Sequence, residues 1–212
     1  MKTIEIEKKV RLEPHQIKKI EQQGRLVKQT QIQDQYFDTV DYRYTTQNIW
    51  LRQRDETFEL KVGIQRQNGA VDRYEEISDE KSILQYLKLD MVNDLPTTLS
   101  QNEIFRFCSF FTQRTSYQLD ELRIDIDDAN FGDFIYRVAE IEIVVSDLES
   151  VHDAEQKILQ FTKTMGIDTS IPVPAKLSYY LYCKRPDHYQ ALVHHKVINP
   201  IILDCIQQAS SL

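Results

Sequence analysis

The sequence is poor in residues that several large classes of protein require. Only five glycines occur among its 212 residues, and no segment forms the glycine-rich loop that binds phosphate in P-loop proteins. No stretch approaches the roughly 18 apolar residues of a membrane-spanning helix, and the opening MKTIEIEKKV lacks the apolar run of a secretory signal. We therefore expect a cytoplasmic protein that makes no contact with membranes.

Cysteine and positive charge are also scarce. The three cysteines, Cys108, Cys183 and Cys205, have no metal-ligand spacing and cannot all pair, which predicts buried free thiols in a reducing compartment. The formal net charge is −7. Because non-specific binding to nucleic acid needs a basic surface, we expect no nucleic-acid partner.

What the chain does contain is typical of a globular protein. Apolar residues make up 41% and charged residues 28%, a balance that can build one sizeable core. The eleven tyrosines and nine phenylalanines favour strands. The length predicts a single domain.

Alternation of apolar and polar residues predicts strands joined by short turns. The first strand, at 4–10, is followed by a helix that begins near Pro14 and stops at Gly24. Strands are also predicted at 31–38, 49–54, 57–64, 71–77, 105–119, 122–127 and 136–145, and a helix at 78–87. A polar connection runs through Pro96, and a Ser146–Glu149 capping box precedes a helix that ends at Gly166. After a proline-rich link the C-terminal stretch has mixed helical character.

Most of these strands have one charged and one apolar face. Side chains two residues apart lie on the same side of a strand, so Glu5, Glu7 and Lys9 share a face. The same spacing groups Arg52 with Arg54, Glu59 with Lys61, Arg123 with Asp125 and Asp127, and Glu140 with Glu142. A half-buried sheet has such a polar side facing water, but that side usually mixes threonine, serine and glutamine rather than arginine pairs and acid pairs.

The alternative is a sheet that curls until its charged faces look inward. Buried charges are costly unless they neutralise each other or bind ligands. Arginine and lysine bind phosphate oxygens, while clustered carboxylates hold Mg²⁺, which bridges to the phosphates. Residue spacing alone leaves both arrangements open.

An ordered set of motifs resembles the CYTH superfamily, also called triphosphate tunnel metalloenzymes. The first motif, Glu5-Ile-Glu7-Lys-Lys9, resembles the ExExK signature of that superfamily. The others, in order, are Tyr36-Phe-Asp38-Thr39, Trp50-Leu-Arg52-Gln-Arg54, Glu59-Leu-Lys61, Tyr74-Glu-Glu76, Arg114, Leu122-Arg123-Ile-Asp125-Ile-Asp127, Glu140-Ile-Glu142 and Ala175-Lys176-Leu177. The resemblance extends from residue 5 to about residue 190.

The resemblance implies both a fold and a ligand. The expected fold is α+β, an eight-stranded antiparallel β-barrel that forms a tunnel, with helices packed outside. Residues 1–198 are expected to form one CYTH domain and residues 199–212 a C-terminal tail. The charged lumen would hold a triphosphate with Mg²⁺, for which Mn²⁺ would substitute. Because the superfamily includes thiamine, inorganic and RNA triphosphatases as well as adenylate cyclases, the resemblance indicates the ligand better than the reaction.

Two features resemble thiamine triphosphatases of the animal type. Trp50 lies two residues before the arginine pair, where those enzymes stack a tryptophan on thiamine, and the region from Pro174 to Gln190 resembles their C-terminal region. A tryptophan that only fills the barrel is the alternative. We expect a monomer that hydrolyses thiamine triphosphate, a small-molecule partner, to thiamine diphosphate and phosphate. The alternatives are an inorganic triphosphatase, which needs no stacking residue, an adenylate cyclase, and a non-catalytic polyphosphate-binding module.

The resemblance also assigns roles to residues. The expected metal ligands are Glu5, Glu7, Asp125, Asp127, Glu140 and Glu142, with orientation of basic residues as the alternative for the two aspartates. The expected substrate-binding residues are Lys9, Trp50, Arg52, Arg54, Arg114, Arg123 and Lys176. Lys61 with Tyr36 resembles a pair that helps to activate water, which would require a lowered lysine pKa. Glu76 matches an acidic position of the tunnel, and the neighbouring Glu75 is the alternative residue for that position. The five histidines are expected to be ordinary surface or partly buried residues.

Overall fold

The computed structural model describes residues 3–64 and 71–200. Its strands are β1 (Thr3–Val10), β2 (Arg25–Asp38), β3 (Ile49–Arg54), β4 (Thr57–Gly63), β5 (Asp72–Ile77), β6 (Phe105–Leu119), β7 (Leu122–Asn130) and β8 (Ile135–Val145). Its helices are α1 (Pro14–Gln23), α2 (Glu80–Leu87), α3 (Leu95–Gln101), α4 (Val151–Thr164), α5 (Lys176–Lys184) and α6 (Pro186–His194), with a short 3₁₀ helix, η1 (Thr45–Gln47).

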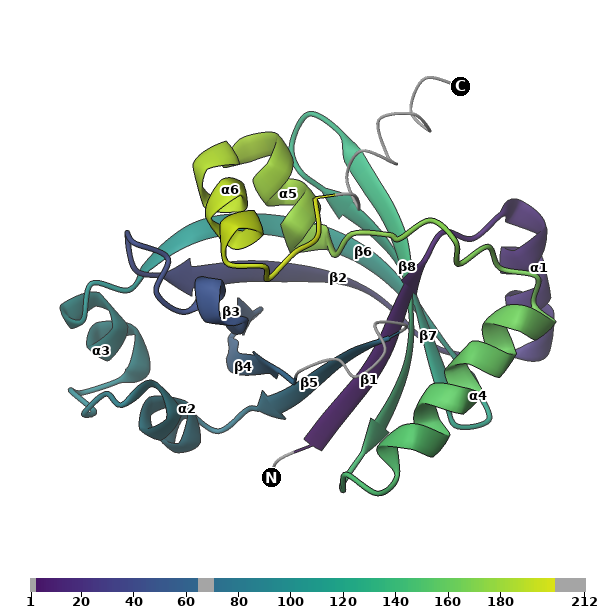
Figure 1. Cartoon of the computed structure of the whole chain (residues 1–212), viewed down its shortest axis with the longest axis horizontal. Helices are drawn as coiled ribbons and strands as arrows, with labels where there is room; N and C mark the ends of the chain where they lie inside the picture. Colours follow the sequence, from purple (N-terminus) through teal and green to yellow (C-terminus); the bar gives the residue numbers. More distant parts are fainter. Residues whose placement is uncertain (1–2, 65–70, 201–212) are drawn as a thin grey trace.

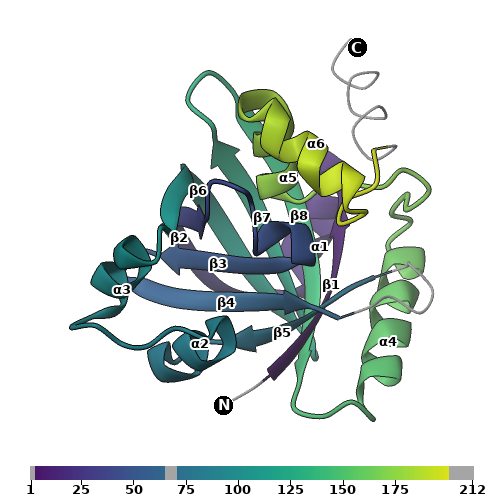
Figure 2. The ribbon, with the colours of Figure 1, turned by 60° about the vertical axis from the view of Figure 1, so that its left-hand side comes forward.

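The strands form one closed barrel in the order β1-β5-β4-β3-β2-β6-β7-β8 (Figures 1 and 2). All neighbours run antiparallel, and β1 closes the barrel by pairing with both β5 and β8. The helices lie outside the strands, so the predicted architecture is confirmed. Closure removes the exposed edges that an open sheet would present.

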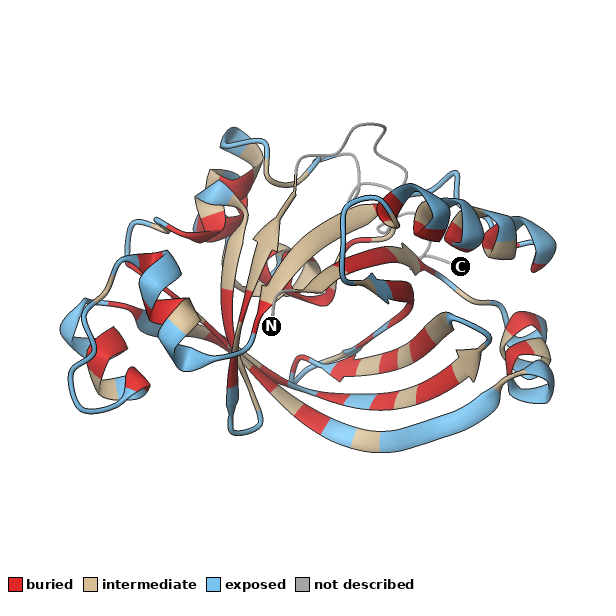
Figure 3. Ribbon diagram, turned by 90° about the horizontal axis from the view of Figure 1, so that it is seen from below, coloured by how far each residue is buried: buried red, intermediate tan, exposed pale blue. Residues whose placement is uncertain are grey.

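Apolar side chains on the outer face of the barrel hold the helices in place. Ile6, Ile124 and Ile141 have no exposed surface and share a cluster with Ala154 and Ile158 of α4. The buried residues of α4 recur every three or four positions, as one face of a helix requires. Figure 3 shows helices whose barrel-facing side is buried and whose outer side is exposed.

Two further apolar clusters lie around the barrel. Helices α2 and α3 pack on strands β3 to β5 through a cluster that includes Leu51, Leu60 and Ile83. Helices α5 and α6 pack on the barrel through a cluster that includes Leu181 and Leu192. Where helices cover the outer faces of the strands, the charged faces are left for the interior.

The structure corrects several local predictions. The segment through Pro96 is helix α3 rather than a connection, because Asp94 caps it by accepting the backbone N–H of Thr97 at 2.7 Å. Strand β2 begins at Arg25 rather than residue 31, since its exposed first half, which has no apolar alternation, still pairs with β6. The predicted Ser146–Glu149 capping box is wrong: α4 begins after Ser150, whose backbone N–H donates to Asp147 at 2.8 Å.

The cysteine prediction holds only in part for the described residues. Cys108 is buried and Cys183 is exposed, both as free thiols, so burial was wrongly predicted for Cys183. Cys205 and residues 201–212 of the predicted tail lie outside the described residues. In the part of the chain that the structure describes, no helix is long and apolar enough to cross a membrane.

Candidate active site in the barrel lumen

A cavity of about 350 Å³ lies inside the barrel and is lined mainly by charged side chains. The residues predicted from the sequence that line it are Glu5, Glu7, Lys9, Tyr36, Trp50, Arg52, Arg54, Lys61, Glu76, Arg114, Arg123, Glu140, Glu142 and Lys176. The charged strand faces therefore look inward rather than toward bulk water. Asp125 and Asp127 are the two predicted site residues that lie behind the lining.

The strand register places opposite charges side by side in the lumen. Across β1 and β8, Lys9 faces Glu140. Across β3 and β4, Arg52 faces Glu59, and across β4 and β5, Lys61 faces Glu76. Directly opposed side chains in antiparallel strands interact most strongly. The alternation within each strand and the register between strands therefore place cationic side chains against carboxylates in the lumen.

The most completely neutralised part is the Arg114 network, formed by Arg114, Asp125, Asp127, Glu140 and Lys176. Arg114 donates to Asp127 at 2.7 and 2.6 Å, to Asp125 at 2.5 Å and to Glu140 at 2.9 Å. Lys176, from α5, donates to Glu140 at 2.9 Å and also contacts Asp127.

In the Arg114 network, nearby cations outweigh the effect of burial on the pKa of Glu140. Burial opposes ionisation of Glu140, yet Lys176 and Arg114 hold its pKa well below the ordinary range. Asp125 and Asp127 have no exposed surface. Because their carboxylates are already bound by Arg114, the geometry favours their orienting role over the alternative role as metal ligands.

A second group of carboxylates, the acidic cluster of Glu5, Glu7 and Glu142, is less completely neutralised. One carboxylate oxygen from each lies within 4.8 Å of the others. Glu7 faces Glu142 directly across β1 and β8, and such like-charge pairs are destabilising without a cation between them. Burial raises the pKa of Glu7 despite Lys9, and burial and Glu5 raise that of Glu142 well above the ordinary range.

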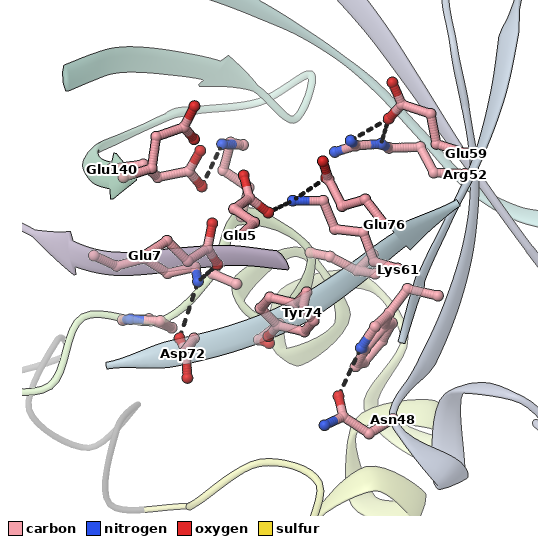
Figure 4. Close-up of a pocket in the computed structure, with 18 of the residues that line it drawn as sticks. Glu5, Glu7, Asn48, Arg52, Glu59, Lys61, Asp72, Tyr74, Glu76 and Glu140 are labelled. Atoms are coloured by element: carbon pink, nitrogen blue, oxygen red, sulfur yellow. Dashed lines mark hydrogen bonds and ion pairs between the residues drawn. The ribbon is translucent and has the colours of Figure 1, made fainter. Parts of the chain in front are cut away.

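Lys61 lies beside the acidic cluster, between Glu5 and Glu76 (Figure 4). Its ammonium contacts Glu5 and lies 3.0 Å from Glu76. Burial lowers the pKa of Lys61, but Glu5 and Glu7 overcome that effect and the net direction is upward. This direction favours a charge-supplying role for Lys61, and its role in activating water stays a prediction.

Tyr36, the predicted partner of Lys61, lines the same cavity from another strand. Tyr36 faces Arg52 across β2 and β3, whereas Lys61 faces Trp50 across β3 and β4. Strand β3 therefore separates the backbones of the two residues. The ring of Tyr36 packs among Phe107 and Phe110, and burial raises the pKa of its hydroxyl.

Asp34 is an important residue that sequence reasoning missed. It has no exposed surface and accepts two hydrogen bonds from Arg54, at 2.8 and 3.2 Å. Burial opposes its ionisation, but Arg52 and Arg54 lower its pKa to about 2. Its position two residues before Tyr36, on the same strand face, is the signal that could have identified it.

Asp72 was also missed, and Tyr74 was named within a motif but given no role, although both precede Glu76 at the same two-residue spacing. Asp72 accepts a hydrogen bond from Lys9 at 3.0 Å. The ring of Tyr74 lies near two ammonium groups, 5.9 Å from that of Lys9 and 5.5 Å from that of Lys61. These residues hold both lysines at the cavity wall.

One side of the cavity is apolar. This apolar wall consists of Trp50 together with Val173, Val197 and Ile198, which also pack against a shared hydrophobic cluster. The indole Nε1 of Trp50 donates to Asn48 at 2.8 Å (Figure 4). The lumen thus combines a long charged surface with one aromatic and aliphatic wall.

The loop before Trp50 is organised by two buried polar residues. Asp38 accepts backbone N–H groups of Thr39 at 2.7 Å, Tyr44 at 3.0 Å and Thr45 at 2.8 Å. His188 of α6 is hydrogen-bonded through Nε2 to the Thr45 hydroxyl at 2.7 Å and has no exposed surface. The prediction of an ordinary surface or partly buried histidine is therefore wrong for His188, whose pKa burial lowers to about 4.

A family model for the CYTH domain matches residues 3–171 of the chain. Human thiamine-triphosphatase is 29% identical over 208 residues, a match that covers 90% of this chain and 89% of the human protein. The same enzyme from Macaca fascicularis is 28% identical over the same share of each chain.

Solved structures share the fold at lower sequence identity. One is a Hippeastrum protein classed with adenylyl cyclases and described as having a dominant triphosphatase activity. It superposes with a TM-score of 0.54 at 17% identity, covering 88% of this chain and 98% of its own. A conserved hypothetical protein from Pyrococcus furiosus superposes with a TM-score of 0.54 at 18% identity, covering 81% and 96% of the two chains.

Proposed function

We propose that this chain, which belongs to the CYTH domain family, is a magnesium-dependent triphosphatase whose substrate is thiamine triphosphate. The observation that carries the proposal is one lumen in which an acidic cluster, a row of cationic side chains and an aromatic wall line the same cavity. Its volume of about 350 Å³ lies in the usual range for small-molecule sites. Thiamine-triphosphatases among the curated relatives support the choice of substrate.

The acidic cluster fits a hard divalent cation. Glu5, Glu7 and Glu142 offer carboxylate oxygens within 4.8 Å of one another, and Mg²⁺ prefers such oxygen ligands. Glu140, another of the predicted ligands, accepts hydrogen bonds from Arg114 and Lys176, and its role as a metal ligand stays a prediction. When bound, Mg²⁺ would neutralise negative charge on the triphosphate and so favour departure of the diphosphate group.

Cationic side chains would bind the remaining phosphate oxygens. Arg52, Arg54 and Lys61 line the cavity from β3 and β4, and Arg123 lines it from β7. Their carboxylate partners, such as Asp34 for Arg54, fix the guanidinium groups before substrate enters. Preorganised charge of this kind costs no rearrangement at the moment of reaction.

Hydrolysis itself requires little covalent chemistry from the protein. A water oxygen would bond to the terminal phosphorus while the bond from phosphorus to the bridging oxygen breaks, which releases phosphate and thiamine diphosphate. Positioning and charge neutralisation supply most of the rate in such reactions. Lys61 and the arginines would supply positive charge, and the apolar wall would receive the organic group.

Steady-state kinetics would test the proposal directly. Thiamine triphosphate, tripolyphosphate and ATP are compared at equal Mg²⁺, with phosphate release as the measurement. The expected result is the highest kcat/KM for thiamine triphosphate and no activity with a chelator. Preference for tripolyphosphate would favour the inorganic triphosphatase, cyclic AMP from ATP would indicate a cyclase, and binding without turnover would indicate a non-catalytic module.

Trp50→Ala separates a stacking role from a structural one. Aromatic and cation–π contact with thiamine is worth roughly 1–2 kcal/mol, so kcat/KM for thiamine triphosphate should fall about fivefold to thirtyfold. Tripolyphosphate hydrolysis should change by only a few fold, and Trp50→Phe should retain part of the preference. Equal losses on both substrates in a folded variant would contradict stacking.

A further inference from the structure

We infer that Asn48 is a positioning residue that fixes the orientation of the Trp50 ring and thereby sets the preference for triphosphates with a cationic aromatic group. The inference deepens the proposed function and rests on it. Asn48 lies outside the motifs that resemble the CYTH superfamily. Its role follows from three contacts around the cavity wall.

The first contact is with Trp50 itself. An indole has a single hydrogen-bond donor, and in Trp50 this Nε1 donates to the Asn48 Oδ1 at 2.8 Å. Both residues line the cavity and both are only partly buried. Because the ring edge is tied to a neighbour on the same wall, the ring cannot rotate freely before a ligand arrives.

The second contact fixes Asn48. Its backbone is left-handed, with φ 61° and ψ 35°, a conformation that asparagine tolerates better than most residues. The backbone N–H of Asn48 donates to Thr45 at 3.0 Å, and its carbonyl accepts from Gly63 at 2.8 Å. Thr45 is in turn held by Asp38 and His188, so the loop that carries Asn48 is anchored on both sides.

The third contact explains the glycine at position 63. A Cβ built on Gly63 would lie 1.7 Å from the Asn48 Nδ2 and 2.2 Å from its Cγ. The Gly63 backbone is not left-handed, so the close approach of the Asn48 amide, rather than a special φ, requires glycine here. Gly63, Asn48 and Trp50 form one packed unit across β3 and β4.

Fixing the ring before binding should favour substrates that stack on it. Immobilising a side chain on binding weakens affinity by about twofold to tenfold, and a ring that is already held avoids that loss. Tripolyphosphate has no organic group and gains nothing from an ordered ring. Asn48 should therefore affect the ratio of the two kcat/KM values rather than turnover in general.

The experiment compares Asn48→Gly with Asn48→Asp. Glycine keeps the left-handed backbone and removes the acceptor, so kcat/KM for thiamine triphosphate should fall about twofold to tenfold relative to tripolyphosphate. Aspartate keeps the acceptor and should preserve the ratio, although its charge weakens binding of both anions alike. Gly63→Ala, which displaces the Asn48 amide, should reproduce the ratio change of Asn48→Gly. Thermal unfolding confirms that each variant is folded.

Trp50 is the sole tryptophan, so intrinsic fluorescence reports its ring without any substrate. Asn48→Gly should lower the fluorescence anisotropy and raise acrylamide quenching, whereas Asn48→Asp should match the wild type. Unchanged fluorescence in Asn48→Gly would overturn the positioning role, and changed fluorescence with an unchanged substrate ratio would overturn the role in specificity. If wild-type protein fails to hydrolyse thiamine triphosphate, the proposed function fails, while the fluorescence comparison still decides whether Asn48 positions the ring.

Discussion

The Arg114 network and the acidic cluster lie in the same lumen but balance their charges differently. In the network, Arg114 and Lys176 supply hydrogen bonds to three carboxylates with distances of 2.5 to 2.9 Å. In the cluster, two of three glutamates have raised pKa values because burial is not offset by nearby cations. The comparison teaches that two cations of the protein are shared among the network's carboxylates, whereas in the cluster two glutamates face one another at the place where we propose that a metal binds.

The difference originates in the cations that reach each carboxylate. Glu140 faces both Lys9 and Asp125 from its place on β8, and Arg114 joins Asp125 to Glu140 from β6. Glu142 likewise faces one acid, Glu7, and one cation, Arg123, but its contact with Arg123 is 3.6 Å long. Glu140 and Glu142 lie only two residues apart on β8. A small change of position therefore separates a carboxylate bound by the protein's own cations from a candidate metal ligand.

Arg114→Met should give the largest loss of stability. The substitution keeps an apolar stem but removes the guanidinium that binds both Asp125 and Asp127, which have no exposed surface. Removing one member of a buried ion pair costs about 3–5 kcal/mol. Urea unfolding measures the free energy of unfolding.

The matched control for this loss is Arg123→Met, because the Arg123 side chain is 43% exposed and contacts both Asp125 and the acidic cluster. Its free energy of unfolding should fall by less than about 1 kcal/mol. Equal losses in the two variants would mean that the Arg114 network contributes no more to the free energy of unfolding than the rest of the lumen.

Arg52→Ala should weaken triphosphate binding by about 2–5 kcal/mol, because it removes a cation from a buried charged surface. Arg52 belongs to neither group of carboxylates and is bound by Glu59. Calorimetric titration with tripolyphosphate measures the effect. Arg137→Ala serves as control, since Arg137 pairs with Asp128 through a side chain that is 67% exposed. Unchanged affinity in Arg52→Ala would show that phosphate binds elsewhere.

Glu7→Gln should abolish the response to magnesium. A ligand at 100 times its Kd stabilises the folded state by about 2.7 kcal/mol, so Mg²⁺ should raise the Tm of the wild type but not of this variant, which should also lose most turnover. Without metal the stability of the variant should change little, because relief of the repulsion from Glu142 offsets the loss of the ion pair between Glu7 and Lys9. Glu59→Gln, outside the acidic cluster, should keep the Mg²⁺ response. A Glu7→Gln variant that is still stabilised by Mg²⁺ would place the metal elsewhere.

Replacing Mg²⁺ with Mn²⁺ should give the smallest effect. Both ions prefer oxygen ligands and octahedral coordination, and the acidic cluster offers only carboxylates. Turnover should therefore persist when Mn²⁺ is added to chelator-treated protein, as measured by phosphate release. Zn²⁺, which favours nitrogen and sulfur donors, is the control and should support less turnover.

Most of the lumen could be predicted because a strand directs every second side chain to one side. That rule placed Glu5, Glu7 and Lys9 together, and the structure lines the cavity with all three. It did not reveal Asp34 or Asn48. Each is important through a partner on another strand or across a turn, and one sequence carries no direct record of such pairs.

The sequence by itself determined where strands form, which face of each is charged and, through the ordered motifs, the class of barrel. Only the tertiary structure decided which charges neutralise one another, because pairing between strands joins residues that are distant along the chain. Packing placed Arg114 of β6 and Lys176 of α5 against Glu140, set Asp125 and Asp127 behind the cavity wall, and left Glu5, Glu7 and Glu142 together. The physical reason is that a carboxylate's role depends on its nearest cation, and folding brings that cation from a distant part of the chain.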